Sequence, residues 1–191
     1  MATIDLRRRR IDARIVYYGP AQSGKTTNLQ NIHARLPEGS RGEMRSIATE
    51  AERTLFFDFV PIEPLTIGGW DIRFHLYSVP GQDDYVRTRR ALLAGADGIV
   101  FVADAAPDRQ SANMASRDEL LDHMRHYGKS LETLALVVQV NKLDLPTIVD
   151  PVELGKTLAL GDAPVIEAIA IQGNGVAETL TAITRGVAKA L

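Results

Sequence analysis

The sequence predicts a doubly wound α/β domain, in which a six-stranded, mostly parallel sheet contains one antiparallel strand and has helices on both faces. Short apolar runs rich in β-branched residues alternate with longer segments of helical period along most of the chain. Two of the runs, "GIVFVADA" and "LALVVQV", are apolar almost throughout, which is typical of parallel strands buried on both faces. The Gly68-Gly69 pair between two neighbouring runs indicates a hairpin turn, which makes one strand antiparallel.

The predicted elements follow one another in the order that this architecture requires. Strands are expected at 13–18, 55–62, 71–79, 98–103, 135–140 and 165–170. Helices are expected at 26–36, 111–127, 152–158 and 176–190. Residues 37–54 are polar, lack an apolar period and form a longer loop than a compact domain usually has without a purpose. This segment is therefore a candidate functional loop.

The bulk composition predicts a single domain, residues 1–191. The chain is 45% hydrophobic and has a formal net charge of −2, so its charge does not favour nucleic acid as a partner. It has no cysteine, which excludes disulfides, thiolate metal sites and thiol nucleophiles. The basic run from Arg7 to Arg10 fits a solvated approach to the first strand better than a phosphate-binding patch.

The two ends of the sequence show no targeting or lipidation motif. Met-Ala-Thr-Ile-Asp reaches a charged residue before any apolar run, unlike a signal peptide. The second position is not the glycine that myristoylation needs, and the last four residues contain no cysteine to prenylate. The sequence also has no apolar stretch long enough to span a bilayer. We therefore expect a cytoplasmic protein with no direct membrane anchor.

A phosphate-binding motif stands between the first strand and the first helix. "GPAQSGKT" fits the pattern G-x-x-x-x-G-K-[ST] in its proper context, with a strand before it and a helix after it. Glycines let the backbone wrap a phosphate, Lys25 would reach the β- and γ-phosphates, and the Thr26 hydroxyl would bind Mg²⁺. A plain glycine turn is the alternative, and the motif leaves the base and the reaction open. The residues expected to bind phosphate are Gly19, Ala21, Gln22, Ser23, Gly24, Lys25, Thr26 and Thr27.

A candidate base-binding motif, Asn141-Lys142-Leu143-Asp144, follows the fifth strand. Ligands of such sheets bind at the carboxyl ends of the strands, where Asp144 would lie. Its carboxylate can accept from the N1–H and the exocyclic amine of guanine, while Asn141 ties the loop to the phosphate loop and Lys142 lies on the base plane. After the sixth strand, the Ala170 N–H is expected to face the guanine carbonyl. A polar turn that caps the next helix is the alternative for this motif.

These motifs together resemble the Ras-like small GTPases, a group of P-loop NTPases. A third motif, Pro80-Gly81-Gln82, stands directly after the third strand and completes the set. Longer stretches, among them "IVYYGP", "SGKTTNL", "RFHLYSVPGQ" and "VQVNKLDLP", are similar to the MglA family, the bacterial small GTPases of gliding motility and cell polarity. The resemblance covers nearly the whole chain. It implies binding of GTP and GDP with Mg²⁺, and slow hydrolysis of GTP to GDP.

The resemblance also implies catalytic roles for residues after the phosphate loop. Arg53 would be an arginine finger supplied by the protein itself, and Gln82 would orient the attacking water. Thr54 would reach Mg²⁺ and the γ-phosphate, and the Gly81 N–H would meet the γ-phosphate. Without the resemblance, Arg53 could equally be a surface arginine and Gln82 a solvated loop glutamine.

This chain departs from the pattern of Ras-like proteins at two places. Ser78 stands where most of them have an aspartate that holds Mg²⁺ through water, and a hydroxyl supplies no negative charge. The two alternatives are a weaker affinity for Mg²⁺ and help from another carboxylate, such as Asp58. Ala21 stands where the relatives usually have glycine. Its methyl group either crowds the attacking water and slows GTP hydrolysis, or is accommodated by a small shift of the loop without effect.

The expected partners follow from the same resemblance. The implied activator is an MglB-like homodimer of the Roadblock family, the implied targets are downstream motility and polarity effectors, and recruitment to a cell pole is implied as well. The chain itself is expected to be a monomer. Two rival functions are a P-loop nucleotide kinase acting on a small acceptor and a GTP-binding scaffold with negligible hydrolysis.

Overall fold

The computed structural model describes residues 2–36, 45–48, 54–80, 86–131 and 133–191. Of these, residues 45–48, 54–65, 67 and 88 are described by their backbone alone. None of the described helices is long and apolar enough to cross a membrane.

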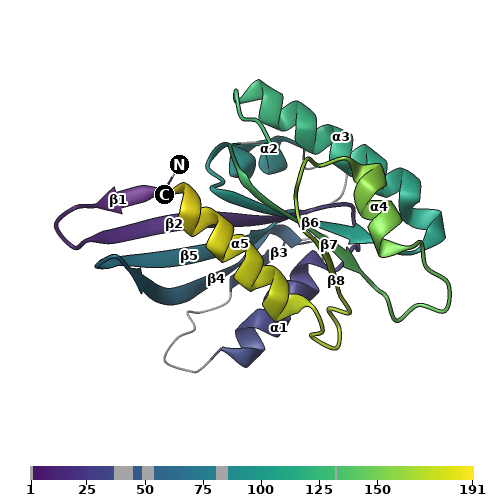
Figure 1. The fold of residues 1–191 in the computed structure, drawn as a ribbon, viewed down its shortest axis with the longest axis horizontal. Coiled ribbons are helices and arrows are strands. Elements are labelled where there is room, and N and C mark those ends of the chain that lie inside the picture. The colour runs from purple at the N-terminus through teal and green to yellow at the C-terminus, as the bar shows by residue number, and fades with distance from the viewer. Residues whose placement is uncertain (1, 37–44, 49–53, 81–85, 132) are drawn as a thin grey trace.

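The described strands form one twisted sheet with the order β3-β4-β5-β2-β6-β7-β8, and β1 pairs with β2 at one end (Figure 1). The strands β5, β2, β6, β7 and β8 are mutually parallel. β4 is antiparallel to β5. The strands span β1 Thr3–Asp5, β2 Arg10–Tyr18, β3 Arg45–Ala48, β4 Thr54–Ile67, β5 Trp70–Ser78, β6 Gly98–Asp104, β7 Ala135–Asn141 and β8 Val165–Glu167.

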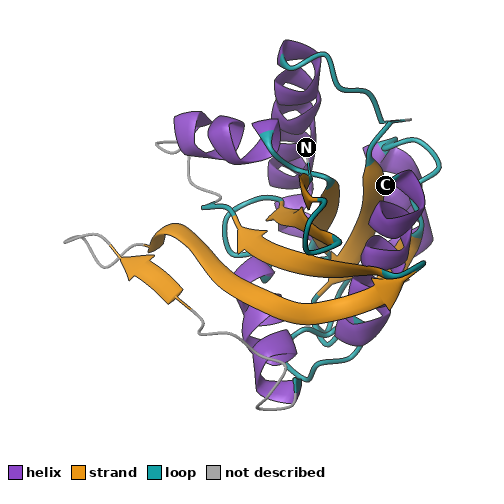
Figure 2. Cartoon of the chain, turned by 90° about the vertical axis from the view of Figure 1, so that its left-hand side faces the viewer, coloured by secondary structure: helices purple, strands orange, loops and turns teal. Residues whose placement is uncertain are grey.

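Helices cover both faces of this sheet, as Figure 2 shows from the side. The helices span α1 Lys25–Arg35, α2 Val86–Ala94, α3 Gln110–His126, α4 Pro151–Leu158 and α5 Val176–Ala190, and a short 3-10 helix spans Pro107–Arg109. The helices α1 and α5 pack on one face, where Leu29 and Ile183 meet Tyr17 in one apolar cluster. The helices α2, α3 and α4 pack on the other face, where Leu120 and Leu154 belong to a second cluster.

Alternating side chains of the central strands feed both clusters. In β2, Ile15 and Tyr17 lie in the first cluster, and Val16 and Tyr18 lie in the second. All seven residues of β6 are buried, because helices cover both of its faces. The predicted α/β fold class is therefore confirmed, with β4 as the expected antiparallel strand, and β1 is also antiparallel to its neighbour β2.

The hairpin between β4 and β5 is also confirmed. Ile67 pairs with Trp70 across Gly68 and Gly69, whose φ angles are 59° and 79°. Two successive residues with positive φ characterise the turn that matches the twist of a two-residue hairpin.

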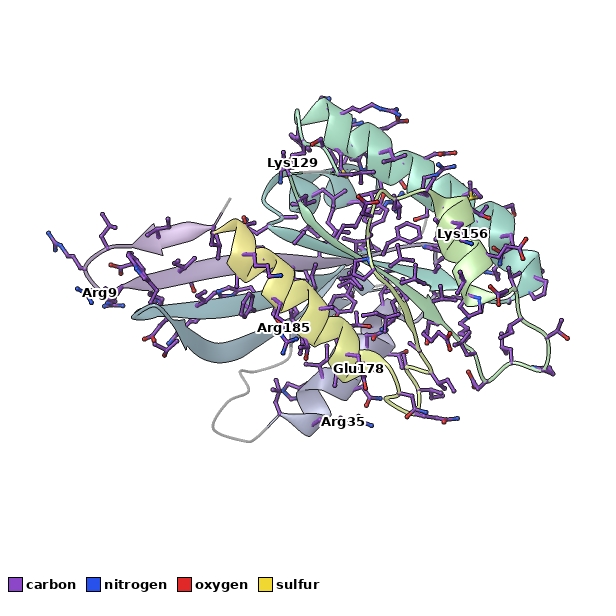
Figure 3. All side chains as sticks on the ribbon, in the orientation of Figure 1. Arg9, Arg35, Lys129, Lys156, Glu178 and Arg185 are labelled. Carbon is purple, nitrogen blue, oxygen red and sulfur yellow. The ribbon has the colours of Figure 1, made fainter. Side chains whose placement is uncertain are left out.

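Besides the short 3-10 helix, the structure adds three elements to those predicted from the sequence. β1 folds back on β2 through a turn that contains Arg7, Arg8 and Arg9, so the basic run forms an exposed hairpin tip (Figure 3, Arg9). β3 lies within the segment 37–54, which was expected to be a loop, and pairs with β4. The helix α2 follows the segment 81–85, which lies outside the described residues.

Three element ends differ from the predictions by three or more residues, and the first is the start of β2, which lies at Arg10 rather than at 13. β4 continues to Ile67 rather than ending at 62, and a register shift between Ile62 and Leu65 adds one residue on the β4 side of the pair. β8 ends at Glu167 rather than at 170, because its pairing with β7 covers only three residues. The chain after Glu167 is thereby free to turn toward the end of the sheet that holds the site.

Candidate functional site

The loop between β2 and α1 has the backbone shape of an anion cradle. Gly19 and Gly24 have φ angles of 138° and 100°, a region that glycine occupies without strain. A Cβ at Gly19 would collide with the carbonyl oxygen of Val102, and a Cβ at Gly24 would collide with the side-chain amide of Asn141. Only glycine therefore fits these two positions, and the loop leads directly into the N-terminus of α1, where backbone N–H groups favour an anion.

Lys25 is buried in this loop, and its hydrogen-bond partners among the described residues are neutral. Its Nζ donates to two carbonyl oxygens of the same loop, at 2.9 and 2.6 Å. Burial above all, and then the positive charges of Arg89, Arg109 and Lys142, lower the pKa of Lys25 to about 7. A buried cation surrounded by further cations is stabilised by a bound anion. The loop thus fits the phosphate chain of a nucleotide.

All eight residues predicted to bind phosphate belong to this one turn and the first turn of α1. Gln22 takes a positive φ of 63°, and Ser23 is buried. The turn consists of Gly19, Ala21, Gln22, Ser23, Gly24, Lys25, Thr26 and Thr27, together with Pro20.

Asn141 joins the phosphate loop to the loop that follows β7. It is the last residue of β7, and its Nδ2 donates to the carbonyl oxygen of Ser23 at 2.8 Å. Its Oδ1 accepts from the N–H of Ala170 at 2.8 Å. The link to the phosphate loop is the one expected from the sequence. The Ala170 N–H thus donates to Asn141 in this structure, and its expected contact with a guanine carbonyl stays a prediction.

A cavity of about 200 Å³ lies beside this junction. Asp144 and Lys142 both line it, and Lys142 has a positive φ of 72°. Such backbone strain in a residue other than glycine is often found at binding sites. The lining residues are Gln22, Gly24, Thr27, Asn141, Lys142, Asp144, Leu145, Ala170 and Ile171. The cavity therefore lies against the base loop and the phosphate loop at once, as a nucleotide base site must.

Two hydroxyl groups mark the candidate magnesium position. Thr26, in the first turn of α1, has its Oγ1 3.4 Å from the Oγ of Ser78, the last residue of β5. Among the residues that the structure describes, no group of three or more His, Cys, Asp or Glu residues is placed to hold a metal ion. Hydroxyl oxygens, with phosphate oxygens and water, are ligands that Mg²⁺ accepts. The described residues thus fit a nucleotide-bound Mg²⁺.

The residues expected to act on the γ-phosphate lie mostly outside the described part of the chain. Arg53, Gly81 and Gln82 lie outside the residues that the structure describes. Thr54 is the first residue of β4, and only its backbone is described. Their roles therefore stay predictions.

A second cavity, of about 550 Å³, opens on the other side of the phosphate loop. It lies between the loop, α2 and α3, and Ala21, Arg89 and Arg109 all line it. The guanidinium of Arg89 donates to Glu119 of α3 at 2.8 Å and to the carbonyl oxygen of Pro80 at 2.9 Å. Arg89 therefore anchors the residue that precedes Gly81 and Gln82.

Reasoning from the sequence did not find several residues of the site. Asn31 and Arg35 of α1 donate to the carbonyl oxygens of Ala170 and Gly173, and so fix the loop after β8 (Figure 3, Arg35). Ile171 is 74% exposed at the edge of the smaller cavity, where it can cover the face of a base. The position of an apolar residue just after Ala170 was the only sequence feature that indicated it.

Asp104 and Arg109 were also missed. Asp104 ends the apolar run of β6 with a fully buried carboxylate, and a carboxylate in such a run was the available indication. Arg109 had no comparable indication, because its contact with the phosphate loop joins residues 88 positions apart.

The fold and the site together define a Ras-like small GTPase domain. The sheet order, the glycine-dependent phosphate loop and the cavity lined by Asp144 are the features of this class that the structure describes. The comparisons with known proteins agree. A model of the ADP-ribosylation factor family matches residues 2–187.

Individual relatives support the same assignment. The chain is 43% identical to the Mutual gliding-motility protein MglA of Myxococcus xanthus over 185 residues, which are 97% of this chain and 95% of that protein. It is 24% identical to the ADP-ribosylation factor-like protein 6 of Caenorhabditis elegans over 93% of this chain and 88% of that protein. It is 32% identical to Elongation factor 4 of Levilactobacillus brevis over 60% of this chain and 18% of that protein. The chain belongs to the ADP-ribosylation factor family and is an MglA-like small GTPase, which confirms the resemblance found in the sequence.

Proposed function

We propose that this small GTPase is a molecular switch that hydrolyses GTP slowly to GDP and controls cell polarity and motility through effectors that bind its GTP form. Its activator is an MglB-like homodimer of the Roadblock family, and it acts as a cytoplasmic monomer that can be recruited to a cell pole. The motility role rests on the 43% identity to a protein named for gliding motility.

One observation supports the nucleotide part of this proposal most strongly. Asn141 bonds to the phosphate loop and to the loop after β8 at 2.8 Å each, so the base cavity and the phosphate loop form one connected site. Asp144 lines the base cavity, where a carboxylate can accept the two donors on the edge of guanine. Adenine offers no such pair of donors, so this arrangement favours GTP over ATP.

Each part of the site contributes to binding or to the reaction. Lys25 compensates the negative charge of the phosphates, and its burial strengthens that interaction. The hydroxyl of Thr26, and that of Ser78 through water, would hold Mg²⁺, which supplies positive charge to the phosphate oxygens during phosphoryl transfer. Gln82 orients the attacking water, and Arg53 stabilises charge on the transferred group.

A nucleotide kinase and a scaffold without hydrolysis remain the rival functions. A kinase needs a lid with arginines and an acceptor pocket. The larger cavity beside Ala21 contains Arg89 and Arg109, but Arg89 is already bonded to Glu119 and Pro80. This pairing favours the switch over the kinase, since Arg89 anchors the segment that leads to Gln82.

Turnover measurements separate the three functions. Radiolabelled GTP is incubated with the protein alone, with a Roadblock-family homodimer from the same organism, and with GMP as a small acceptor; ATP is the control nucleotide. We expect slow release of phosphate from GTP, a marked increase with the homodimer, and no labelled product from GMP. Transfer to GMP would identify a kinase, and the absence of release in every condition would identify a scaffold.

A further inference from the structure

Asp104 is a buried carboxylate that the roles assigned above do not use. It is the last residue of β6, and its side chain is 0% exposed. Asn113 of α3 holds its backbone from both sides: the Asn113 Oδ1 accepts from the Asp104 N–H at 3.0 Å, and the Nδ2 donates to the Asp104 carbonyl oxygen at 2.9 Å. The Asp104 Oδ1 also accepts from the N–H of Ala106 at 3.1 Å. The carboxylate is therefore fixed in place.

Two cations from opposite sides of the site meet at the other oxygen of this carboxylate. Lys142 of the base loop donates its Nζ to the Asp104 Oδ2 at 2.6 Å. The Nε of Arg109 lies 3.8 Å from the same oxygen. A buried carboxylate with two cationic partners meets the usual requirement that a buried charge be paired.

Arg109 extends this cluster to the phosphate loop. Its Nη2 donates to the carbonyl oxygen of Ala21 at 2.6 Å, while its Nε faces Asp104. The side chain is 31% exposed, because it also lines the larger cavity beside the loop. A planar guanidinium can hold two acceptors at fixed angles at the same time, which an ammonium group does less well.

The position of Ala21 indicates which end of the phosphate loop Arg109 holds. Gln22 and Gly24 line the base cavity, whereas Gly19 and Ala21 line the cavity on the other side. A phosphate chain that starts at the base cavity therefore ends nearest to Gly19 and Ala21. The carbonyl that Arg109 holds belongs to the part of the loop next to the terminal phosphate.

We propose that Arg109 is a positioning residue for GTP hydrolysis: held by Asp104, it fixes the Ala21 carbonyl and so the end of the phosphate loop where the γ-phosphate reacts. Through the shared carboxylate, it also connects this end of the loop to Lys142 in the base site. The inference rests on the proposed GTPase function and adds to it a residue that acts through the loop backbone.

The expected effect falls on the reaction more than on binding. Most contacts to the nucleotide come from Lys25, the loop N–H groups and Asp144, and these remain when Arg109 is shortened. Hydrolysis depends more steeply on geometry, because a misplacement of about 1 Å can slow a reaction by about 10²-fold. Partial release of this end of the loop should therefore slow GTP hydrolysis about tenfold.

The test is single-turnover hydrolysis of preloaded GTP, measured together with dissociation of fluorescently labelled GDP. For Arg109→Ala we expect hydrolysis to fall about tenfold and GDP dissociation to change less than about threefold. Arg125→Ala is the matched control: Arg125 lies on α3, is 73% exposed and pairs with Asp122, so both quantities should stay at the wild-type values. GDP-binding stoichiometry and thermal melting show that each variant is folded.

Two further variants separate positioning from charge. Arg109→Lys keeps the charge but cannot hold Asp104 and Ala21 with one planar group, so its hydrolysis rate should stay within about threefold of that of Arg109→Ala. Adding Asp104→Asn to Arg109→Ala should lower the rate less than about twofold further, because both residues act through one contact.

The results that overturn the inference are distinct from those that overturn the proposed function. Wild-type hydrolysis in Arg109→Ala, full recovery in Arg109→Lys, or independent effects of the two substitutions would each refute the positioning role. GDP dissociation that rises as much as hydrolysis falls would make Arg109 a binding residue instead. If the wild-type protein does not hydrolyse GTP at all, the proposed function itself fails.

Discussion

The hydroxyl oxygens of Thr26 and Ser78 lie 3.4 Å apart, one at the start of α1 and the other at the end of β5. The two groups are thus adjacent at the mouth of the phosphate loop, where a nucleotide-bound Mg²⁺ needs oxygen ligands. Neither group carries a negative charge. The affinity for Mg²⁺ must therefore come mainly from the phosphates, and it becomes sensitive to any charge placed at residue 78.

Substitutions at Ser78 should change the Mg²⁺ dependence in opposite directions. Ser78→Asp should lower the Mg²⁺ concentration for half-maximal retention of labelled GDP about tenfold, because a charge-assisted contact exceeds a neutral one by ~1–2 kcal/mol. Ser78→Ala should raise it severalfold. Mg²⁺ titrations of GDP release measure both. Identical titration curves for the three proteins would show that residue 78 has no part in holding the metal.

The pKa of Lys25 predicts a pH dependence of nucleotide binding. Burial above all lowers the pKa of Lys25 to about 7. Bound phosphates favour the protonated form and raise this pKa, so above pH 7 binding takes up a proton and GDP affinity falls, by at most tenfold per pH unit. Below about pH 7 Lys25 is protonated in both states, and this dependence ends.

Calorimetry of GDP binding in two buffers of different ionisation enthalpy measures the uptake directly. We expect close to one proton at pH 8.5 and distinctly less at pH 7. A binding enthalpy that is independent of the buffer at pH 8.5 would contradict this account of Lys25.

The methyl group of Ala21 predicts a slow hydrolysis step. Ala21 lies at the end of the phosphate loop that lines the larger cavity, where the terminal phosphate is expected. Ala21→Gly should raise single-turnover hydrolysis about tenfold, which corresponds to only about 1.4 kcal/mol of barrier, because the in-line transition state needs more room than the bound nucleotide. Equal rates for the two proteins at saturating Mg²⁺ would show that the loop accommodates the methyl.

Arg53 stays a prediction from the resemblance, since it lies outside the described residues. Arg53→Ala should leave GTP binding nearly intact and lower hydrolysis stimulated by the Roadblock-family partner about 10³-fold, the low end for an arginine finger. Arg185→Ala, at an exposed position on α5, is the control (Figure 3). Full stimulated activity of Arg53→Ala would assign the charge stabilisation to another group.

The central fold could be predicted because its elements are encoded locally. β6 and β7 are mostly apolar and almost fully buried, and the φ angles of Gly68 and Gly69 suit a two-residue turn. The helix α2 was missed because "VRTRRALLA" has no continuous apolar face. Tertiary contacts stabilise it instead: Arg89 is buried against Glu119 of α3, which its sequence cannot reveal.

The candidate site was likewise only partly predictable from the sequence. The phosphate loop and Asp144 are recognisable because their chemistry depends on fixed spacings in the sequence. The contacts of Asp104 with Lys142 and of Arg109 with Ala21 join residues 38 and 88 positions apart, so only the folded structure shows them. The bond between the Ala170 N–H and Asn141 spans 29 positions, so it too is shown only by the folded structure.

The most direct test of the guanine site is the base preference of Asp144→Asn. In the wild-type protein the Asp144 carboxylate should accept from both guanine donors, and the amide leaves a mismatch that costs about 2–4 kcal/mol. Xanthine offers an acceptor at that edge, which the new amide can bind. Asp162→Asn, at an exposed position after α4, is the control. We predict that Asp144→Asn loses GTP and gains xanthosine triphosphate in competition binding, whereas unchanged GTP affinity would contradict the assignment of this cavity to guanine.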